Sequence, residues 1–183
     1  MALQRWTIDA SRSAAQFAVR HMIISKVRGA FRRWSGTIDF DPSQPEASKV
    51  SVRIETDSVT TNDSSRDQNL RSADFFDAEK FPAIAFESGR IESRGKDRFR
   101  VRGALDMHGV TRPVELDAQY LGMSKDSAGN ERITFSAKTV LNRKHFGLSW
   151  SEVLETGGVV VGEQVEVSLH VQAIKSHAIE QAA

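Results

Sequence analysis

The sequence has no cysteine among its 183 residues. This absence excludes disulfides, iron–sulfur clusters, thiolate zinc sites and a cysteine nucleophile, so any chemistry has to use oxygen and nitrogen groups. Long apolar runs are absent as well, and no stretch is long enough to span a bilayer as a helix. The first residues lack the apolar segment of ~7 to 15 residues that a secretory signal requires. We therefore expect a soluble, cytoplasmic protein with no transmembrane segment.

A dominant charge of either sign is also missing, because Lys and Arg number 25, Asp and Glu number 24, and the net charge is +1. Such a chain has no long-range field to attract nucleic acid or an anionic membrane. We expect no nucleic-acid partner, and only transient membrane contact is left open. The basic residues gather once, in KVRGAFRRW at 26–34, where a solvated strand face is the simplest interpretation.

What the sequence does contain is alternation of apolar and polar residues with a period of two. Val50, Val52 and Ile54 alternate with polar residues, as in a strand with one buried face and one wet face, and the pattern returns at 98–107 and 165–172. Turn-forming segments separate about eight such strands. No segment between them provides a crossover helix, so the sheet is expected to be antiparallel.

The length of these strands favours a closed barrel over a two-sheet sandwich, because long twisted antiparallel strands curl, and closure removes exposed edges. The sequence predicts one all-β domain over residues 1–175 and a flexible tail over 176–183. A disturbed register near Arg32–Trp34 predicts a bulge in the strand at 27–40. The interior of a barrel of about eight strands is either filled by side chains or holds one small ligand, and both alternatives stay open.

An insert without alternation runs from residue 60 to residue 82, as TTNDSSRDQNLRSADFFDAEKFP. Unstructured loops of this length are uncommon in compact domains, so we expect structure and a function here. Asn62 or Asp63 is expected to cap a short helix that runs through Leu70. The apolar residues of the insert have to cover something, either a barrel mouth or a small core under a surface loop: Leu70, Phe75, Phe76 and Phe81.

Five segments, in order and spacing, resemble the YceI-like family of bacterial lipocalin-like proteins associated with polyisoprenoid binding. They are FAVRHMIISKVRGAFRRWSGTIDFD, VSVRIETDSVTTND, RDQNLRSADFFDAEKFPAIAFES, VRGALDMHGVTRPVEL and RKHFGLSW, within a resemblance over residues 5–174. The resemblance implies an extended eight-stranded lipocalin-like antiparallel barrel whose apolar channel holds a polyprenyl lipid or a quinone tail. It also places the short helical insert near the barrel mouth. Family members commonly carry His where this chain has Asn69, which weakens any role of that histidine here.

Candidate catalytic and metal groups are few. His21 shares strand parity with Phe17 and Val19, so it is expected to point inward, toward either a lipid head group or a core partner. The spacing of the histidines argues against a metal site, and no nucleophile elbow of the Gly-x-Ser-x-Gly type is present. The five histidines are His21, His108, His145, His170 and His177.

We therefore expect a binding protein, not an enzyme, which sequesters, stores or transports a long-chain isoprenoid lipid and needs no cofactor or metal. Two alternatives stay open: an enzyme that acts on a prenyl lipid through His21 and an acidic residue, and a filled barrel for protein association. A homodimer is possible but nothing demands one. Arg28, Arg32 and Arg33 are candidates for neutralising a lipid pyrophosphate. The candidate ligand-binding residues are Phe17, Val19, His21, Phe31, Val52, Phe75, Phe76, Phe86, Phe99, Val101, Phe135, Phe146 and Trp150.

Overall fold

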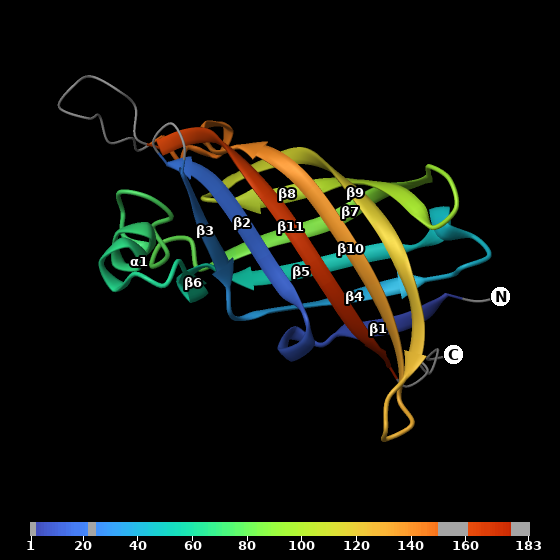
Figure 1. Cartoon of the computed structure of the whole chain (residues 1–183). Helices are drawn as coiled ribbons and strands as arrows, with labels where there is room; N and C mark the ends of the chain where they lie inside the picture. Colours follow the sequence, from blue (N-terminus) through green and yellow to red (C-terminus); the bar gives the residue numbers. More distant parts are fainter. Residues whose placement is uncertain (1–2, 22–24, 150–160, 177–183) are drawn as a thin grey trace.

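The computed structural model describes residues 3–21, 25–149 and 161–176, which form an antiparallel barrel with one α-helix at its side (Figure 1). Short 3-10 turns lie at Ala10–Arg12, Pro45–Ala47, Thr56–Ser58 and Arg143–Phe146. The strands and the helix are β1 Gln4–Ile8, β2 Ala14–His21, β3 Ser25–Phe31, β4 Trp34–Phe40, β5 Lys49–Glu55, β6 Val59–Thr60, α1 Ser64–Arg71, β7 Ala83–Ser93, β8 Arg98–Met107, β9 Val110–Lys125, β10 Glu131–Asn142 and β11 Val161–Lys175.

A ring of eight strands closes because β1 pairs with β4 on one side and with β11 on the other. The order around the ring is β1, β4, β5, β7, β8, β9, β10 and β11, and each neighbouring pair is antiparallel. The prediction of an all-β, eight-stranded antiparallel barrel with a short helix is therefore confirmed. Of the predicted tail, residues 177–183 lie outside the described part of the chain.

Three of the barrel walls are interrupted strands. β1 and β2 follow the same edge of β11 and are separated by the turn at Ala10–Arg12. β3 and β4 are separated at Arg32 and Arg33, where the sequence predicted a bulge, and they pair with β2 and β1 respectively. β5 and β6 are separated by the turn at Thr56–Ser58. β6 pairs with β3, whereas β5 pairs with β4 and β7, so the sheet divides beside α1. We call the end of the barrel beside α1 the mouth. We call the opposite end, where β1 completes the ring of strands, the closed end (Figure 1).

The β8–β9 hairpin also belongs to the mouth, and its turn shows why the chain reverses there. His108 and Gly109 have φ angles of 55° and 74°, and two successive positive φ angles are typical of the type I′ turn that matches strand twist. The His108 ring is then held by a contact of 2.9 Å between its Nδ1 and the Phe146 carbonyl oxygen. This contact fixes the turn at Arg143–Phe146 against the hairpin.

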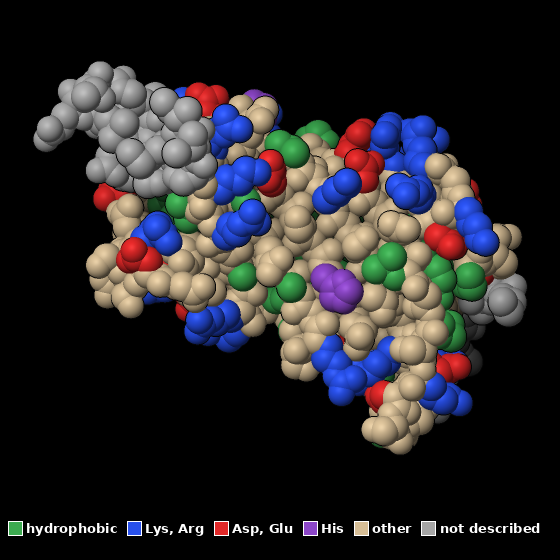
Figure 2. All heavy atoms as spheres, viewed as in Figure 1, with side chains coloured by type: hydrophobic (Ala, Val, Ile, Leu, Met, Phe, Trp, Pro, Cys, Tyr) green, Lys and Arg blue, Asp and Glu red, His purple; other side chains and the backbone are tan. Residues whose placement is uncertain are grey.

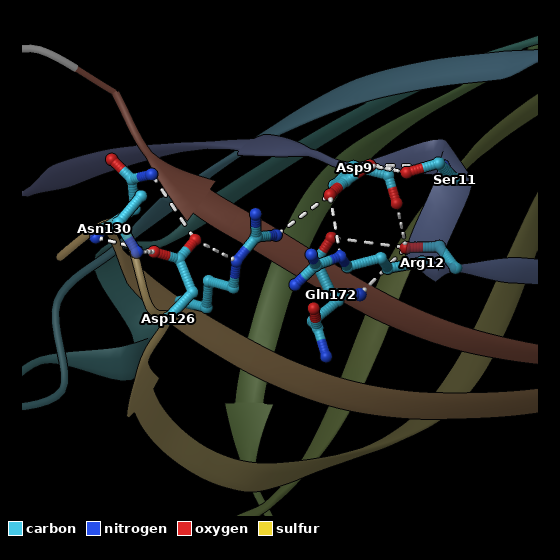
Figure 3. A network of polar contacts seen from close by, with 9 residues as sticks. Asp9, Ser11, Arg12, Asp126, Asn130 and Gln172 are labelled. Atoms are coloured by element: carbon cyan, nitrogen blue, oxygen red, sulfur yellow. Dashed lines mark hydrogen bonds and ion pairs between the residues drawn. The ribbon is translucent and has the colours of Figure 1, made fainter.

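The closed end contains a packed core. It also contains a polar clasp, the network of contacts shown in Figure 3. Arg132, whose side chain is 9% exposed, lies 2.9 Å from Asp9 and 2.9 Å from Asp126. It therefore ties the connection between β1 and β2 to the β9–β10 turn. Backbone N–H donation from Asn130, followed by the bond from Arg132, lowers the pKa of Asp126 to about 2. The clasp is thus built for an ionised carboxylate.

The ladder between β9 and β10 stops short of the mouth. Its last pair is Lys138 with Asp117, although β9 begins at Val110 and β10 continues to Asn142. Pro113 lies on the parted segment of β9, and proline suits a strand edge because it has no N–H to donate. We call the two parted segments, residues 110–116 of β9 and 139–142 of β10, the seam. A groove of about 510 Å³ lies between them.

The outer face of the barrel carries mixed charge. Figure 2 shows basic and acidic side chains interspersed with small, separate hydrophobic spots on one face. On β8, Arg102 pairs with Glu92 and Glu115 from the two neighbouring strands. Such exposed pairs contribute little to stability. They agree with the neutral composition and leave the channel as the distinctive feature.

Candidate ligand channel

A cavity of about 770 Å³ opens at the mouth, between α1 and the mouth ends of β2, β3 and β11. Its barrel side is apolar except for Arg20 and Arg143, because alternate residues of each strand point inward. Val19, Val27, Val165 and Val167 contribute to this side. Its helix side is polar. The cavity therefore has one wall suited to a hydrocarbon and another suited to a polar group.

The polar wall depends on how α1 is anchored. A helix of eight residues is too short to be stable alone, so its position has to come from tertiary contacts. Asp63 caps it by accepting the Arg66 N–H at 3.0 Å. Asp67, which is buried, accepts the N–H of Thr61 at 2.8 Å and its hydroxyl at 2.6 Å. These bonds hold the helix against the end of β6, with Asn69 facing the cavity.

The phenylalanines of the insert divide into two groups. Phe76 is buried and packs on Phe75 and Phe31, with ring centroids 5.0 and 5.9 Å apart, and all three line the mouth cavity. Phe81 instead packs on His108 at 4.9 Å and is absent from the cavity lining. The insert therefore closes one side of the mouth with two phenylalanines and attaches to the β8–β9 hairpin with the third.

A second cavity of about 170 Å³ runs through the barrel interior. Strand alternation produces its lining, which is apolar except for small hydroxyl residues such as Thr139. Leu141 and Val167 line both cavities. We call this pair the waist. The two cavities are therefore adjacent, with the waist side chains between them, and the mouth cavity is the larger.

The structure places most of the candidate residues along this channel. Five line the mouth cavity, namely Phe17, Val19, Phe31, Phe75 and Phe76. Five line the inner cavity, namely Val52, Phe86, Phe99, Val101 and Phe135.

Three candidates do not join these groups. Phe146 is buried in the core cluster beneath the mouth and lines the seam groove, not either of the two cavities. His21 ends β2, but its side chain is outside the described part of the structure. Trp150 lies outside the described residues altogether, as does His177 of the five histidines.

The arginines proposed for a pyrophosphate are not at the channel. Arg33 forms ion pairs with Glu55 and Asp57 on the outer side of the barrel. Arg32 lies near the Thr60 hydroxyl, and neither arginine lines the mouth cavity. The exposed ion pairs of Arg33 agree with the solvated strand face that is the simplest interpretation of this basic stretch.

Other basic residues, which the sequence analysis did not select, do line the mouth: Arg20, Arg66 and Arg143. Arg143 is 1% exposed and donates to the carbonyl oxygens of Gly162 and Leu148. Burial lowers its pKa, and Glu163 acts in the opposite direction. The one sequence signal for Arg143 is its place in the segment RKHFGLSW. Its burial could not be predicted, because a buried arginine depends on partners far along the chain.

Within ranges 3–21, 25–149 and 161–176, no three His, Cys, Asp or Glu side chains gather as metal ligands would. No helix in the same ranges has the length and apolar character needed to cross a bilayer.

Comparison with known proteins gives consistent matches. The family model for the YceI-like domain matches residues 6–173. A UPF0312 protein of Azotobacter vinelandii is 39% identical over 140 residues, which cover 76% of this chain and 73% of the relative. The solved structure of the Campylobacter jejuni YCEI protein is 32% identical, with a TM-score of 0.74 and coverage of 86% of this chain and 90% of that one.

A polyisoprenoid binding domain from Saccharophagus degradans, implicated in plant cell wall breakdown, has a similar structure. Its TM-score is 0.67 at 16% identity, with coverage of 93% of this chain and 98% of that one, so the likeness concerns the fold alone. The family match covers nearly the whole barrel and confirms the resemblance found in the sequence motifs. This chain belongs to the YceI-like domain family.

Proposed function

We propose that the barrel binds a long-chain isoprenoid lipid, a polyprenyl lipid or a quinone-type molecule, for sequestration, storage or transport. One observation carries the proposal: an apolar inner cavity lies next to a mouth cavity that also has polar lining residues, and the two share Leu141 and Val167. A ligand that matches both parts has a long hydrocarbon tail and a small polar head. The polyisoprenoid binding domain with the same fold is consistent with this class of ligand.

The apolar tail supplies the binding energy. Burial of one CH₂ group is worth ~0.8 kcal/mol, so a five-carbon prenyl unit contributes at most about 4 kcal/mol. Association and ordering consume part of this gain, and for ligands of drug size about 0.3 kcal/mol per atom remains, or about 1.5 kcal/mol per unit. A tail of several units therefore binds usefully without any catalytic group.

The head group is expected at α1. Ser65 and Asn69 present a hydroxyl and an amide to the mouth cavity, and these groups can both donate and accept hydrogen bonds. Arg66 is already engaged with Thr61, through Nε to its hydroxyl at 2.7 Å and Nη2 to its carbonyl oxygen at 3.0 Å. A neutral head group with donor and acceptor atoms fits this wall, and such groups are found on quinones and prenyl alcohols.

The inner cavity also sets a requirement for binding. Its volume of about 170 Å³ is far smaller than the 770 Å³ of the mouth, so a tail enters the barrel only if the lining side chains move apart. Leu141 and Val167 at the waist have to move first. Binding is therefore expected to be slower than diffusion alone permits.

The test is organic extraction of the gently purified protein, followed by mass spectrometry, with a mock purification as the control. We expect a stoichiometric species with repeating five-carbon units. Delipidated protein is then titrated with solanesol and with a straight-chain alcohol of similar carbon number. Repeated absence of extracted lipid, combined with no uptake of solanesol, would refute the proposal and favour a filled barrel that associates with proteins.

A further inference from the structure

Two aromatic rings limit the inner cavity toward the closed end. Phe40 on β4 and Phe135 on β10 both line the cavity, and their rings meet edge to face with centroids 5.3 Å apart. Tyr120 packs behind them, with its centroid 5.4 Å from Phe40 and 5.2 Å from Phe135. Tyr120 itself is absent from the cavity lining. We call the Phe40–Phe135 pair the floor.

The barrel beyond the floor is solid. Ile133 precedes Phe135 by two residues and therefore points to the same side of β10. It pairs with Ala173 on β11, both residues have no exposed surface, and neither lines the cavity. Trp6 is packed in the same core cluster. A tail that reached this depth would have to displace fully buried side chains.

The barrel just above the floor is open by comparison. Ala137 follows Phe135 by two residues and faces the same interior, where it pairs with Ala118 on β9. Both alanines line the cavity. The small side chains leave space above the large rings, so the cavity narrows where the rings begin.

We propose that Phe40 and Phe135 determine the longest isoprenoid tail that the barrel accepts, an inference that rests on the proposed lipid binding. A tail that extends to the floor gains affinity with each unit. One further unit has to remain in water at the mouth or displace the rings. The barrel is thus selective for tail length as well as for apolar character.

The size of the effect follows from counting carbon atoms. Replacement of Phe135 by Ala removes six ring carbons, and the space persists because cores relax only partly around such a deletion. A prenyl unit has five carbons. Phe135→Ala is therefore expected to extend the longest accepted tail by about one unit. Ala137→Phe adds a ring one layer nearer the mouth and is expected to shorten it by at least one unit.

The experiment is competition binding with prenyl alcohols that differ by one unit, measured for the whole chain and each variant. Wild-type affinity is expected to rise with tail length and then level off. The length at which it levels off should increase in Phe135→Ala and decrease in Ala137→Phe. Phe81→Ala is the matched control, because Phe81 packs on His108 and lines neither cavity. Phe135→Leu and Ala137→Leu replace the larger changes if those variants melt early.

The outcomes separate this inference from the proposed function. If the wild type binds no prenyl alcohol of any length, lipid binding itself fails. If it binds them without a limiting length, or if the limiting length is the same in the Phe135 and Ala137 variants, the floor has no such role. A shift of equal size in Phe81→Ala would also overturn the inference.

Discussion

The waist offers the sharpest test of a channel that continues from the mouth into the barrel. Val167 on β11 pairs with Thr139 on β10 and Phe17 on β2, and its side chain lines both cavities. Val167→Phe adds four carbon atoms at this constriction. We expect the larger ring to separate the two cavities, so that a tail stays in the mouth and no longer enters the barrel.

The expected magnitude depends on the units excluded. Each prenyl unit contributes between about 1.5 and about 4 kcal/mol. Exclusion of two units therefore costs at least about 3 kcal/mol, which corresponds to a loss of affinity of about a hundredfold. A ligand short enough to remain in the mouth loses nothing by the same argument.

The assay is competition titration with solanesol, which has a long tail, and with geraniol, which has a short one. Val167→Phe is expected to lose affinity for solanesol by about a hundredfold and to retain affinity for geraniol. Ser168→Phe is the matched control, because it adds a ring to the same strand at an exposed position that lines neither cavity. Equal solanesol affinity in wild type and Val167→Phe, in a variant with unchanged thermal unfolding, would refute the channel reasoning.

Two further predictions concern stability. The pKa of Asp126 is lowered from 3.8 to about 2 in the folded protein, so its stabilising contribution is present above pH 4 and lost as the pH falls toward 2. Urea unfolding measured across this range should show a smaller acid-induced loss for Asp126→Asn than for wild type, and identical losses would contradict the assignment. Asp67→Ala leaves the N–H of Thr61 without its acceptor, at a cost of about 1 to 3 kcal/mol for a buried donor. Hydrogen exchange should increase in α1 and at Thr61 while the exchange of β10 and β11 stays unchanged, and uniform change throughout the barrel would point to another cause.

The strand pattern and the barrel were predictable because alternation records which side of a strand is buried. β5 and β11 show this plainly, since their inward residues Val52 and Val167 belong to unbroken alternating runs. The closing contact was not predictable, because Trp6 on β1 meets Lys175 on β11 and nothing local in either segment signals the other. The number of strands was therefore easier to infer from the sequence than their pairing.

The residues that line the cavities were predictable wherever inward and outward residues alternate regularly along a strand. Phe135 and Val101 belong to continuous strands, and their inward direction follows from their neighbours. Parity gives no guidance where a strand breaks, as at Arg33 between β3 and β4, whose ion pair with Glu55 joins it to β5. Phe146 follows no alternation, and its position depends on a contact with His108 that is remote in sequence.

Because of the seam between β9 and β10, the mouth end of the barrel is easier to widen than the closed end. Widening the closed end would break the β1–β11 ladder and the ion pairs of Arg132, each hydrogen bond costing about 1 kcal/mol. Moving residues 110–116 of β9 away from residues 139–142 of β10 breaks no pair between these two strands, because the β9–β10 ladder already ends at Lys138. Expansion of the channel is therefore directed toward the mouth half, and the closed end keeps its shape while the guest is accommodated.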